Sequence, residues 1–443
     1  MNRIAINEVL DQLPIEELES SLNEFLSPII ERMPEKRLGK VVPLSVQGIL
    51  GSESPVVLQM AQAVSSNKGE TWSVAKRMYG LLWNERLSHE EMSEGLYAIS
   101  QENVGRANPE YLVIAVDPVN FEKPYTEKLE GVSTVYKSTP AGPNGQARLT
   151  SGYPSITASV VNTPIPATTY ANWFSYQKDF LSENVEIQRA FDCTNRLFPS
   201  YRRRYVMDAG FDDKRWFNHL KDDEFAIRAS HFERIIEIYN ERLERWEPET
   251  LGDMVDTTLF THKFRVNFTH ARKVRLADLD IGWFRFRLPG TEQELWAIVT
   301  YEEHKDRTLV LITNVPLLAL SIVRSVYDDW RQRGRIEHAG APRARFDQEQ
   351  GLDVEDMRVQ TLERMKRLFI LVLAAAQFVF FLIDSWPQPA ILWIRYLGGK
   401  LGLDNDLDGP YLVLRGLASL FQALSTLSYL RINPFPRQHS TYR

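Results

Sequence analysis

Two aspartates stand at the ends of short apolar runs of the kind that form buried strands. Asp117 ends the run at 111–116 and Asp208 ends the run at 205–207. A carboxylate at the end of a core strand is held rigidly at the edge of a sheet, where polar ligands collect. Two such carboxylates on neighbouring strands repel each other, and a divalent cation relieves that repulsion. The alternative is that both are ordinary turn or helix-capping aspartates.

A third carboxylate, Glu337, lies in a segment with helical character and many basic residues. Arg333 and Glu337 are four residues apart and therefore share one face of a helix. This pattern fits a solvated ion pair, or a third metal ligand with an arginine beside it that binds phosphate. Three carboxylates holding two ions about 3.5–4 Å apart can activate a water or a 3′-hydroxyl and stabilise the leaving oxygen of a phosphodiester.

The segments around these carboxylates resemble the catalytic blocks of bacterial insertion-sequence transposases of the DDE class. Their order also matches, and so does a β-rich insertion between the second aspartate and the glutamate, which is typical of one large branch of that family. The resemblance covers about residues 108 to 385. The matching segments are Val113-Ile-Ala-Val-Asp117, Phe121-Glu-Lys-Pro-Tyr125, Gly152-Tyr-Pro154, Tyr205-Val-Met-Asp-Ala-Gly-Phe-Asp212, Arg333 to Glu337, and Gly351 to Val359.

The resemblance implies an α/β fold with a ribonuclease H-like mixed sheet, a β-rich insertion, and helical N- and C-terminal regions. It implies a metal-dependent DNA nuclease and strand transferase that uses Asp117, Asp208 and Glu337 as catalytic residues. The same three side chains would bind two Mg²⁺ or Mn²⁺ ions. The implied partners are double-stranded DNA, as transposon ends and as target, and a second copy of the chain in a homodimer. The implied location is the bacterial cytoplasm, at the nucleoid.

The third block departs from the family pattern, which reads Tyr, two residues, Arg, three residues, Glu, six residues, Lys. Trp330 stands at the Tyr position, and Tyr327 lies one turn earlier. Ala344 stands at the Lys position, between Arg343 and Arg345, either of which would have to bind the phosphate instead. Arginine and lysine bind phosphate in different geometries, so this exchange is not neutral.

Further side chains are predicted to contact phosphate or DNA. Arg333, Trp330 and Tyr327 surround the third block, and Arg204 lies in a basic triplet just before the second aspartate, where a solvated turn is the alternative. In the expected β insertion, basic residues alternate with apolar ones, which indicates a sheet with one buried and one DNA-facing side. These basic residues are Lys263, Arg265, Arg272, Lys273 and Arg275.

Two other functions remain open. The departures in the third block are compatible with a catalytically silent, transposase-derived DNA-binding protein. Leu309 points the same way, because it stands where some relatives have a tryptophan that accepts a flipped base. The intact set of three carboxylates argues against silence, because an unused cluster of carboxylates would repel itself without benefit. A metal-dependent nuclease without strand transfer is the second alternative.

The composition is that of an ordinary globular protein with a sizeable core. Hydrophobic residues make up 44% and charged residues 25% of 443 residues, which allows two or three domains. A net charge of -6 excludes a uniformly basic surface but not local DNA binding. One cysteine, Cys193, excludes an internal disulfide and a multi-cysteine zinc site, and it suits a reducing compartment.

Hydrophobic periodicity divides the chain into five regions. Residues 1–107 are expected to be helical, and the resemblance implies that they help to bind transposon ends. Residues 108–230 form the first part of the catalytic core, with strands near 111–117, 153–161, 165–170, 205–208 and 225–228. Residues 231–307 hold an amphipathic helix at 231–250 and the β insertion. The second part of the core, with Glu337 on a helix over 317–339, is 308–348, and 349–443 is a helical C-terminal region.

The apolar stretch from Leu368 to Ile383 is the nearest approach to a membrane span. It is shorter than the roughly 20 residues that a span requires. We therefore expect it to be a buried core helix, and we expect no membrane partner.

Overall fold

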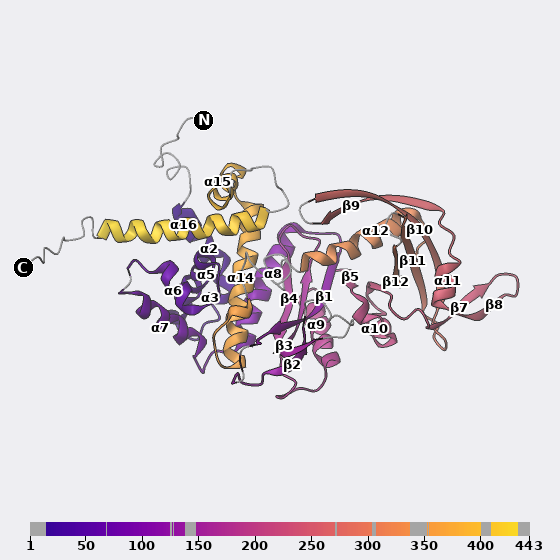
Figure 1. The fold of residues 1–443 in the computed structure, drawn as a ribbon, viewed down its shortest axis with the longest axis horizontal. Helices are drawn as coiled ribbons and strands as arrows, with labels where there is room; N and C mark the ends of the chain where they lie inside the picture. The colour runs from indigo at the N-terminus through magenta and orange to yellow at the C-terminus, as the bar shows by residue number, and fades with distance from the viewer. Residues whose placement is uncertain are drawn as a thin grey trace, which may run out of the picture.

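The three parts of the molecule follow one another along its longest axis: a helical region, a central sheet and a β-rich insertion (Figure 1). They are seen in a computed structural model. The structure describes residues 15–67, 69–124, 126, 128–137, 148–270, 273–303, 307–336, 352, 354–399 and 409–432.

The N-terminal region is helical, as expected. Ser88 accepts a hydrogen bond from the amide of Glu91, and the Glu91 side chain accepts one from the amide of Ser88. This capping box fixes the start of the last and longest of the helices. In order they are α2 (Ile15–Phe25), α3 (Ser27–Ile30), α4 (Lys36–Gly39), α5 (Val41–Ser52), α6 (Val57–Val64), α7 (Thr71–Leu82) and α8 (His89–Ala107).

The central sheet has a ribonuclease H-like strand order, which confirms the expected fold class. The strands run β4–β3–β1–β5–β6, with β1, β3 and β4 antiparallel and β5 and β6 parallel to β1. Helices connect β4 to β5 and β5 to β6. The elements are β1 (Leu112–Glu122), β2 (Ser133–Tyr136), β3 (Leu149–Val160), β4 (Ala167–Trp173), α9 (Glu183–Leu197), β5 (Arg203–Met207), η1 (Ala209–Phe211), α10 (Lys214–His219) and β6 (Glu224–Arg228).

The insertion extends the same sheet rather than forming a separate one. Its last strand, β12, pairs antiparallel with β6, and β11 and β10 follow outward. The elements are β7 (Ile235–Asn240), β8 (Arg245–Thr250), α11 (Leu251–Asp256), β9 (His262–His270), β10 (Lys273–Arg287), β11 (Glu294–Glu302) and β12 (Arg307–Thr313).

The amphipathic helix expected at 231–250 was wrong, because this segment is the hairpin of β7 and β8. Three isoleucines at 235, 236 and 238 favour extended backbone over helix. Glu244 adopts the left-handed conformation, with φ of 48°, which turns the chain between the strands. Across the hairpin the side chain of Asn240 donates to Glu247, and Arg245 pairs with the same carboxylate at 2.7 Å.

A long helix was expected over 317–339. The observed helix, α12 (Leu320–Arg331), is shorter, and the chain continues from it as a turn of 3-10 helix, η3 (Gln332–Arg335). The C-terminal part is helical, as expected. Its elements are η4 (Val354–Asp356), α14 (Leu362–Ser385), α15 (Gln388–Gly398) and α16 (Gly409–Ile432).

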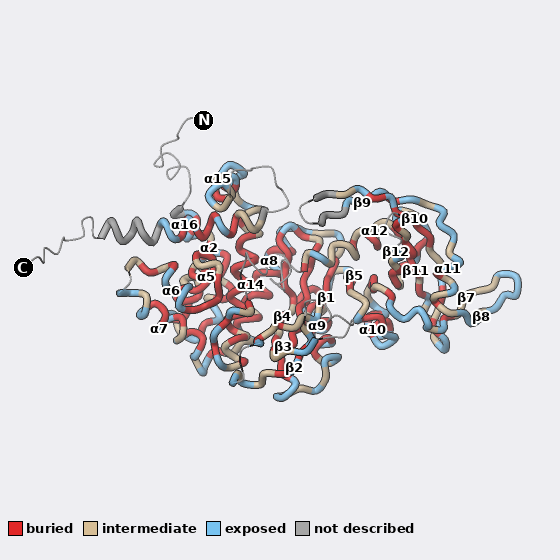
Figure 2. Tube along the Cα trace, viewed as in Figure 1, coloured by how far each residue is buried: buried red, intermediate tan, exposed pale blue. Residues whose placement is uncertain are grey.

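Helix α14 is a core helix, which confirms the expectation for the apolar stretch at 368–383. It has 24 residues, and an 18-residue stretch within it has a mean hydropathy of 2.3, which is apolar enough to cross a membrane, but 72% of that stretch is buried inside the protein. Figure 2 shows this burial along the helix between the N-terminal helices and the sheet. The centre of the Phe369 ring lies 5.5 Å from that of Phe121 on β1 and 5.4 Å from that of Trp173 on β4. The N-terminal helices, α14 and one end of the sheet therefore share a single core.

Candidate active site

The register of two parallel strands brings Asp117 and Asp208 to equivalent positions. Ala115 on β1 pairs with Val206 on β5, so two residues further along each strand Asp117 lies beside Asp208. Side chains alternate between the faces of a strand, so both aspartates share the face of Ala115 and Val206. These two residues belong to the same buried cluster as the inner side of α12. The two carboxylates therefore emerge on the sheet face that α12 covers.

Asp208 follows its strand, as expected, whereas Asp117 does not end its own strand. β1 continues through Pro118 to Glu122, because β3 still pairs with it there. What ends near Asp117 is the pairing of β1 with β5, whose last partner on β1 is Ala115. Asp208 caps η1 by accepting a hydrogen bond of 2.8 Å from the amide of Ala209.

The guanidinium of Arg333 lies between the two aspartates. Its Nη1 is 3.8 Å from Oδ1 of Asp117, and its Nη2 is 3.5 Å from Oδ2 of Asp208. Arg333 reaches them from η3, which packs against β1 at the end of α12. The side chain is 20% exposed, so its charge is only partly screened by water. A fixed positive charge therefore offsets part of the repulsion between the carboxylates.

Arg228 is a second arginine at the site, and the sequence analysis missed it. It is the last residue of β6, and its Nη1 lies 3.7 Å from Oδ1 of Asp208. Met207 pairs with Ile227 in parallel register, which puts Arg228 beside Asp208. The signal was present in the sequence, because an apolar strand that ends in arginine follows the strand that ends in aspartate.

Glu337, Arg343 and Arg345 lie outside the described residues. The last described residue before them, Ile336, is fully buried in the same cluster as Val113 and Val206. Arg335 holds this end of the chain, because its guanidinium donates to the carbonyl of Val161 and, at 2.9 Å, to that of Thr163. Burial lowers the pKa of Arg335.

Arg204 lies inside the protein rather than at a phosphate-binding surface. It is 4% exposed and pairs with Asp329 of α12 and, at 2.6 Å, with Glu224. Tyr111 donates a hydrogen bond of 2.8 Å to the same Asp329 carboxylate. Burial raises the pKa of Asp329, whereas the hydrogen bond from Tyr111 and the charge of Arg204 oppose that change. These contacts hold α12 against β5. They account for the charge of Arg204 without a contact to DNA.

Trp330 and Tyr327 are packed against the protein. The indole Nε1 of Trp330 donates to the carbonyl of Met207 at 3.0 Å, immediately before Asp208. The Arg333 guanidinium lies 5.9 Å from the centre of the Trp330 ring. Tyr327 is 2% exposed, and burial raises its pKa to about 12. Trp330 therefore helps to position Arg333, and Tyr327 belongs to the core.

The basic residues of the insertion are largely paired with acids across the β9–β10 ribbon. Lys263 lies 3.0 Å from Asp280, and Arg265 lies 2.9 Å from Asp278. Arg275 pairs with Glu302 of β11. Arg272 lies outside the described residues, and Lys273 is the first residue of β10. These three ion pairs carry little net charge, so DNA contact through Lys263, Arg265 or Arg275 would require the pairs to open.

The carboxylate oxygens of Asp117 and Asp208 are suitable ligands for a hard divalent cation. Carboxylate oxygens on one sheet face are the ligands that Mg²⁺ and Mn²⁺ prefer, and Mg²⁺ commonly uses one or two carboxylates and retains water. The two aspartates face Arg333 and Arg228, so the same place can also receive a phosphate. The chemistry of the donors thus matches a metal-dependent reaction at phosphate.

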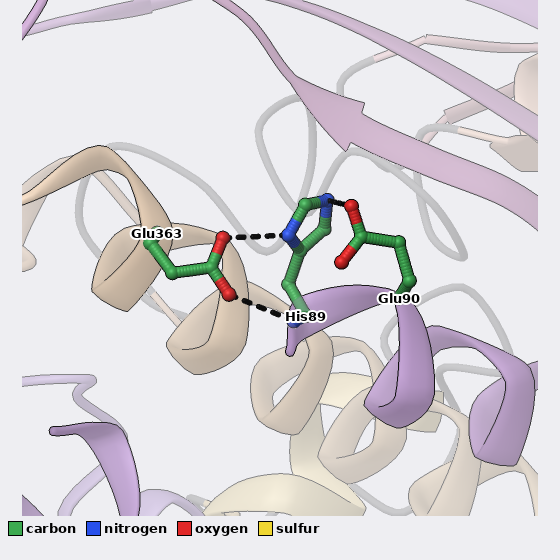
Figure 3. Close-up of side chains that lie close together, drawn as sticks. All are labelled: His89, Glu90 and Glu363. Atoms are coloured by element: carbon green, nitrogen blue, oxygen red, sulfur yellow. Dashed lines mark hydrogen bonds and ion pairs between the residues drawn. The ribbon is translucent and has the colours of Figure 1, made fainter. Parts of the chain in front are cut away.

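A different group of three metal-capable side chains lies at the junction of α8 and α14. It comprises His89, Glu90 and Glu363, and it is the one such group found among the described residues (Figure 3). His89 Nδ1 lies 2.6 Å from Glu363 and Nε2 lies 3.2 Å from Glu90, so both ring nitrogens already face carboxylates. The amine of Lys366 lies 3.4 Å from His89 Nε2, and its charge disfavours a cation there. We interpret the group as an ion-paired fastening between the two helices.

Fold and site together define a ribonuclease H-like α/β protein with an arginine-flanked pair of acidic residues. No family model matches the chain, and no curated protein matches it. A solved structure of a piggyBac transposase synaptic complex with hairpin DNA is similar to it at 8% sequence identity and a TM-score of 0.38. The similarity covers 96% of this chain and 80% of that chain. Both measures are low, and the case for a function rests on the chain's own residues.

Proposed function

We propose that the chain is a DDE-type DNA transposase. It cleaves transposon ends and joins them to target DNA by metal-dependent phosphodiester hydrolysis and strand transfer. The observation that carries the proposal is the pairing of β1 with β5, which sets Asp117 and Asp208 side by side with Arg333 between them. Neighbouring carboxylates repel each other, and a divalent cation would relieve the part of that repulsion that Arg333 does not offset.

Each residue has a distinct task in this proposal. Asp117, Asp208 and Glu337 hold Mg²⁺ or Mn²⁺, two ions in all. When bound, such ions lower the pKa of water and stabilise charge on phosphate oxygens. Arg333 and Arg228 bind the non-bridging phosphate oxygens and orient the scissile bond. Water first cleaves the bond at the transposon end, and the freed 3′-hydroxyl then attacks a target phosphodiester.

Two copies of the chain would act on paired transposon ends. The helical N-terminal region would bind end sequences. Lys263, Arg265 and Arg275 would contribute only where their acidic partners release them, and Lys273 would contribute beside them. Arg343 or Arg345 would bind phosphate in place of the lysine that Ala344 replaces.

The test uses the purified full chain with DNA that carries the inverted repeats flanking the reading frame. We expect cleavage at the repeat ends and joined products in the presence of Mg²⁺ or Mn²⁺. Asp208→Asn should abolish both, because the amide cannot replace the anionic ligand. Asparagine is as good a cap as aspartate, so η1 and the fold should persist. Asp328→Asn, which alters a surface ion pair of α12, is the matched control and should retain activity.

Two results would replace the proposal with one of its alternatives. Cleavage without joined products, under conditions that supply target DNA, would identify a nuclease. Binding of the repeats without cleavage, in the wild-type chain with either metal, would identify a silent DNA-binding protein.

A further inference from the structure

One face of helix α7 carries a row of aromatic and basic side chains, of which the two tryptophans are exposed. Trp72, Lys76, Tyr79 and Trp83 follow one another at intervals of four, three and four residues, which align side chains on one face of a helix. The buried residues of α7 occupy the opposite face, at 74, 75, 78, 81 and 82. Arg364 of α14 lies beside the end of this row. We call these five residues the tryptophan stripe.

The exposure of the two tryptophans sets the stripe apart. Trp72 is 58% and Trp83 is 51% exposed, and no other tryptophan among the described residues is exposed. Tryptophan carries more apolar surface than any other side chain, and a fold normally covers most of it. Two exposed rings on one row indicate a surface that receives a partner.

Cations accompany both rings. The Lys76 amine lies 5.8 Å from the centre of the Trp72 ring, and the Arg364 guanidinium lies 4.9 Å from that of Trp83. Tyr79 packs against Trp83 at 5.1 Å, with the two rings tilted by 31°. Neither Lys76 nor Arg364 forms an ion pair with a side chain in the described part of the protein. Their charge is therefore available to a negatively charged partner.

We propose that the tryptophan stripe binds unpaired nucleotides of a DNA strand. Aromatic rings stack on bases of any sequence, and adjacent lysine and arginine side chains bind the backbone phosphates. A duplex hides the faces of its bases and could use only the two cations. A purely apolar protein partner would leave those cations unpaired. The inference rests on the proposed function only in taking DNA as the partner.

The position and length of the stripe suit this role. α7 lies at the helical end of the molecule, far along the long axis from the β7–β8 hairpin and outside the β1–β5 region that carries the aspartates (Figure 1). From Trp72 to Trp83 the helix rises about 16 Å, at about 1.5 Å per residue. That length accommodates several nucleotides, and site sizes of about 4 to 16 nucleotides are usual for single-strand-binding surfaces.

The test is the binding of a fluorescein-labelled twelve-residue oligothymidylate to the full chain, in EDTA and low salt, followed by anisotropy. We expect Trp72→Ala to weaken binding at least about fivefold, since stacking of one base is worth that much or more. Trp72→Phe should retain most of the affinity because it keeps a ring. Lys76→Gln should lower the slope of log affinity against log salt by about one. Phe260→Ala, which removes an exposed ring from the insertion, should change nothing.

Several results would overturn the proposal. They are an absence of binding by the wild-type chain, an unchanged affinity of Trp72→Ala, and an equal loss of affinity for a blunt duplex of the same length. Capture of a proline-rich peptide at Trp72 in preference to the oligonucleotide would point to a protein partner instead. Because EDTA removes divalent ions, the assay is independent of catalysis. If the stripe bound the oligothymidylate but the chain did not cleave repeat DNA, the transposase proposal would fail and the present one would stand.

Discussion

The guanidinium of Arg333 stands 3.5 Å from the carboxylate of Asp208, although the whole β insertion separates them in the sequence. The same guanidinium reaches Asp117, so one fixed cation serves two acids on adjacent strands. A metal ion and this arginine favour the same carboxylates, and their contributions must therefore be coupled. The coupling can be measured without knowing the DNA substrate.

We expect Arg333→Gln to increase the stabilisation that Mg²⁺ confers. Without divalent ions the variant should lose about 1 kcal/mol, because the aspartates lose a partly buried cation. The more negative site should then bind Mg²⁺ more tightly, which raises the melting temperature by a larger amount than in the wild type. Thermal unfolding with EDTA and with Mg²⁺ measures both effects.

Arg324→Gln is the control, because it breaks an i,i+4 pair with Asp328 away from the site. Equal Mg²⁺-induced shifts in wild type, Arg333→Gln and Arg324→Gln would show that Asp117 and Asp208 do not bind the ion. In the cleavage assay, Arg333→Gln should lose about two orders of magnitude in rate, as is usual when a cation at a reacting phosphate is removed.

The free energy of unfolding should depend on pH through the carboxyl group of Glu363. Burial alone would raise its pKa, but hydrogen bonds from the His89 ring and backbone amide, together with the charge of Arg367, lower it from 4.5 to about 2. The folded pKa lies below the unfolded one, so the carboxylate stabilises the fold above about pH 4.5, and this contribution is lost as the pH falls towards 2.

Glu363→Gln should therefore cost about 1–2 kcal/mol at neutral pH, reduced for solvent screening because the side chain is 39% exposed. Urea unfolding across this pH range should show a flatter profile for the variant. Glu90→Gln, on the other ring nitrogen and 69% exposed, should have a smaller effect. A profile parallel to that of the wild type would exclude the assigned role of Glu363.

The ion pair of Arg204 and Asp329 should contribute to the free energy of unfolding and not to the affinity for DNA. Removing one member of a buried pair leaves an uncompensated charge, which costs about 3–5 kcal/mol. We expect Arg204→Met to lose this much in urea unfolding. Arg202→Met, whose side chain is 53% exposed, should lose little. If Arg204→Met instead kept its stability and lost affinity for duplex DNA, Arg204 would be the phosphate ligand that its position in a basic triplet suggested.

Gly152 should tolerate no side chain. A Cβ there would lie 2.3 Å from the carbonyl oxygen of Phe121 and 2.7 Å from Cγ2 of Val135, because β3 crosses closely between β1 and β2 at this point. We expect Gly152→Ala to destabilise the fold by at least about 1–3 kcal/mol. Gly80→Ala is the matched control, since a Cβ at that helical position meets nothing within 4 Å, and it should be neutral or stabilising. Equal stabilities of the two variants would contradict the close approach.

The sequence by itself determined the strands that carry Asp117 and Asp208, the helical ends and the buried nature of α14. Apolar runs and periodicity are local properties, so these features can be read from neighbouring residues. It also supplied a resemblance strong enough to predict a ribonuclease H-like sheet, which the strand order confirms. It failed at 231–250, where charges spaced as on a helix overshadowed the preference of three isoleucines for a strand.

Only the tertiary structure decided which charged groups meet. The register of β1 against β5 sets Asp117 beside Asp208, and the path of α12 and η3 brings Arg333 to both. The same packing withdrew Arg204 into the core and paired Lys263 and Arg265 with aspartates. A charge has no preferred partner along the chain, because its interaction energy depends on distance and burial, and only the folded chain sets those.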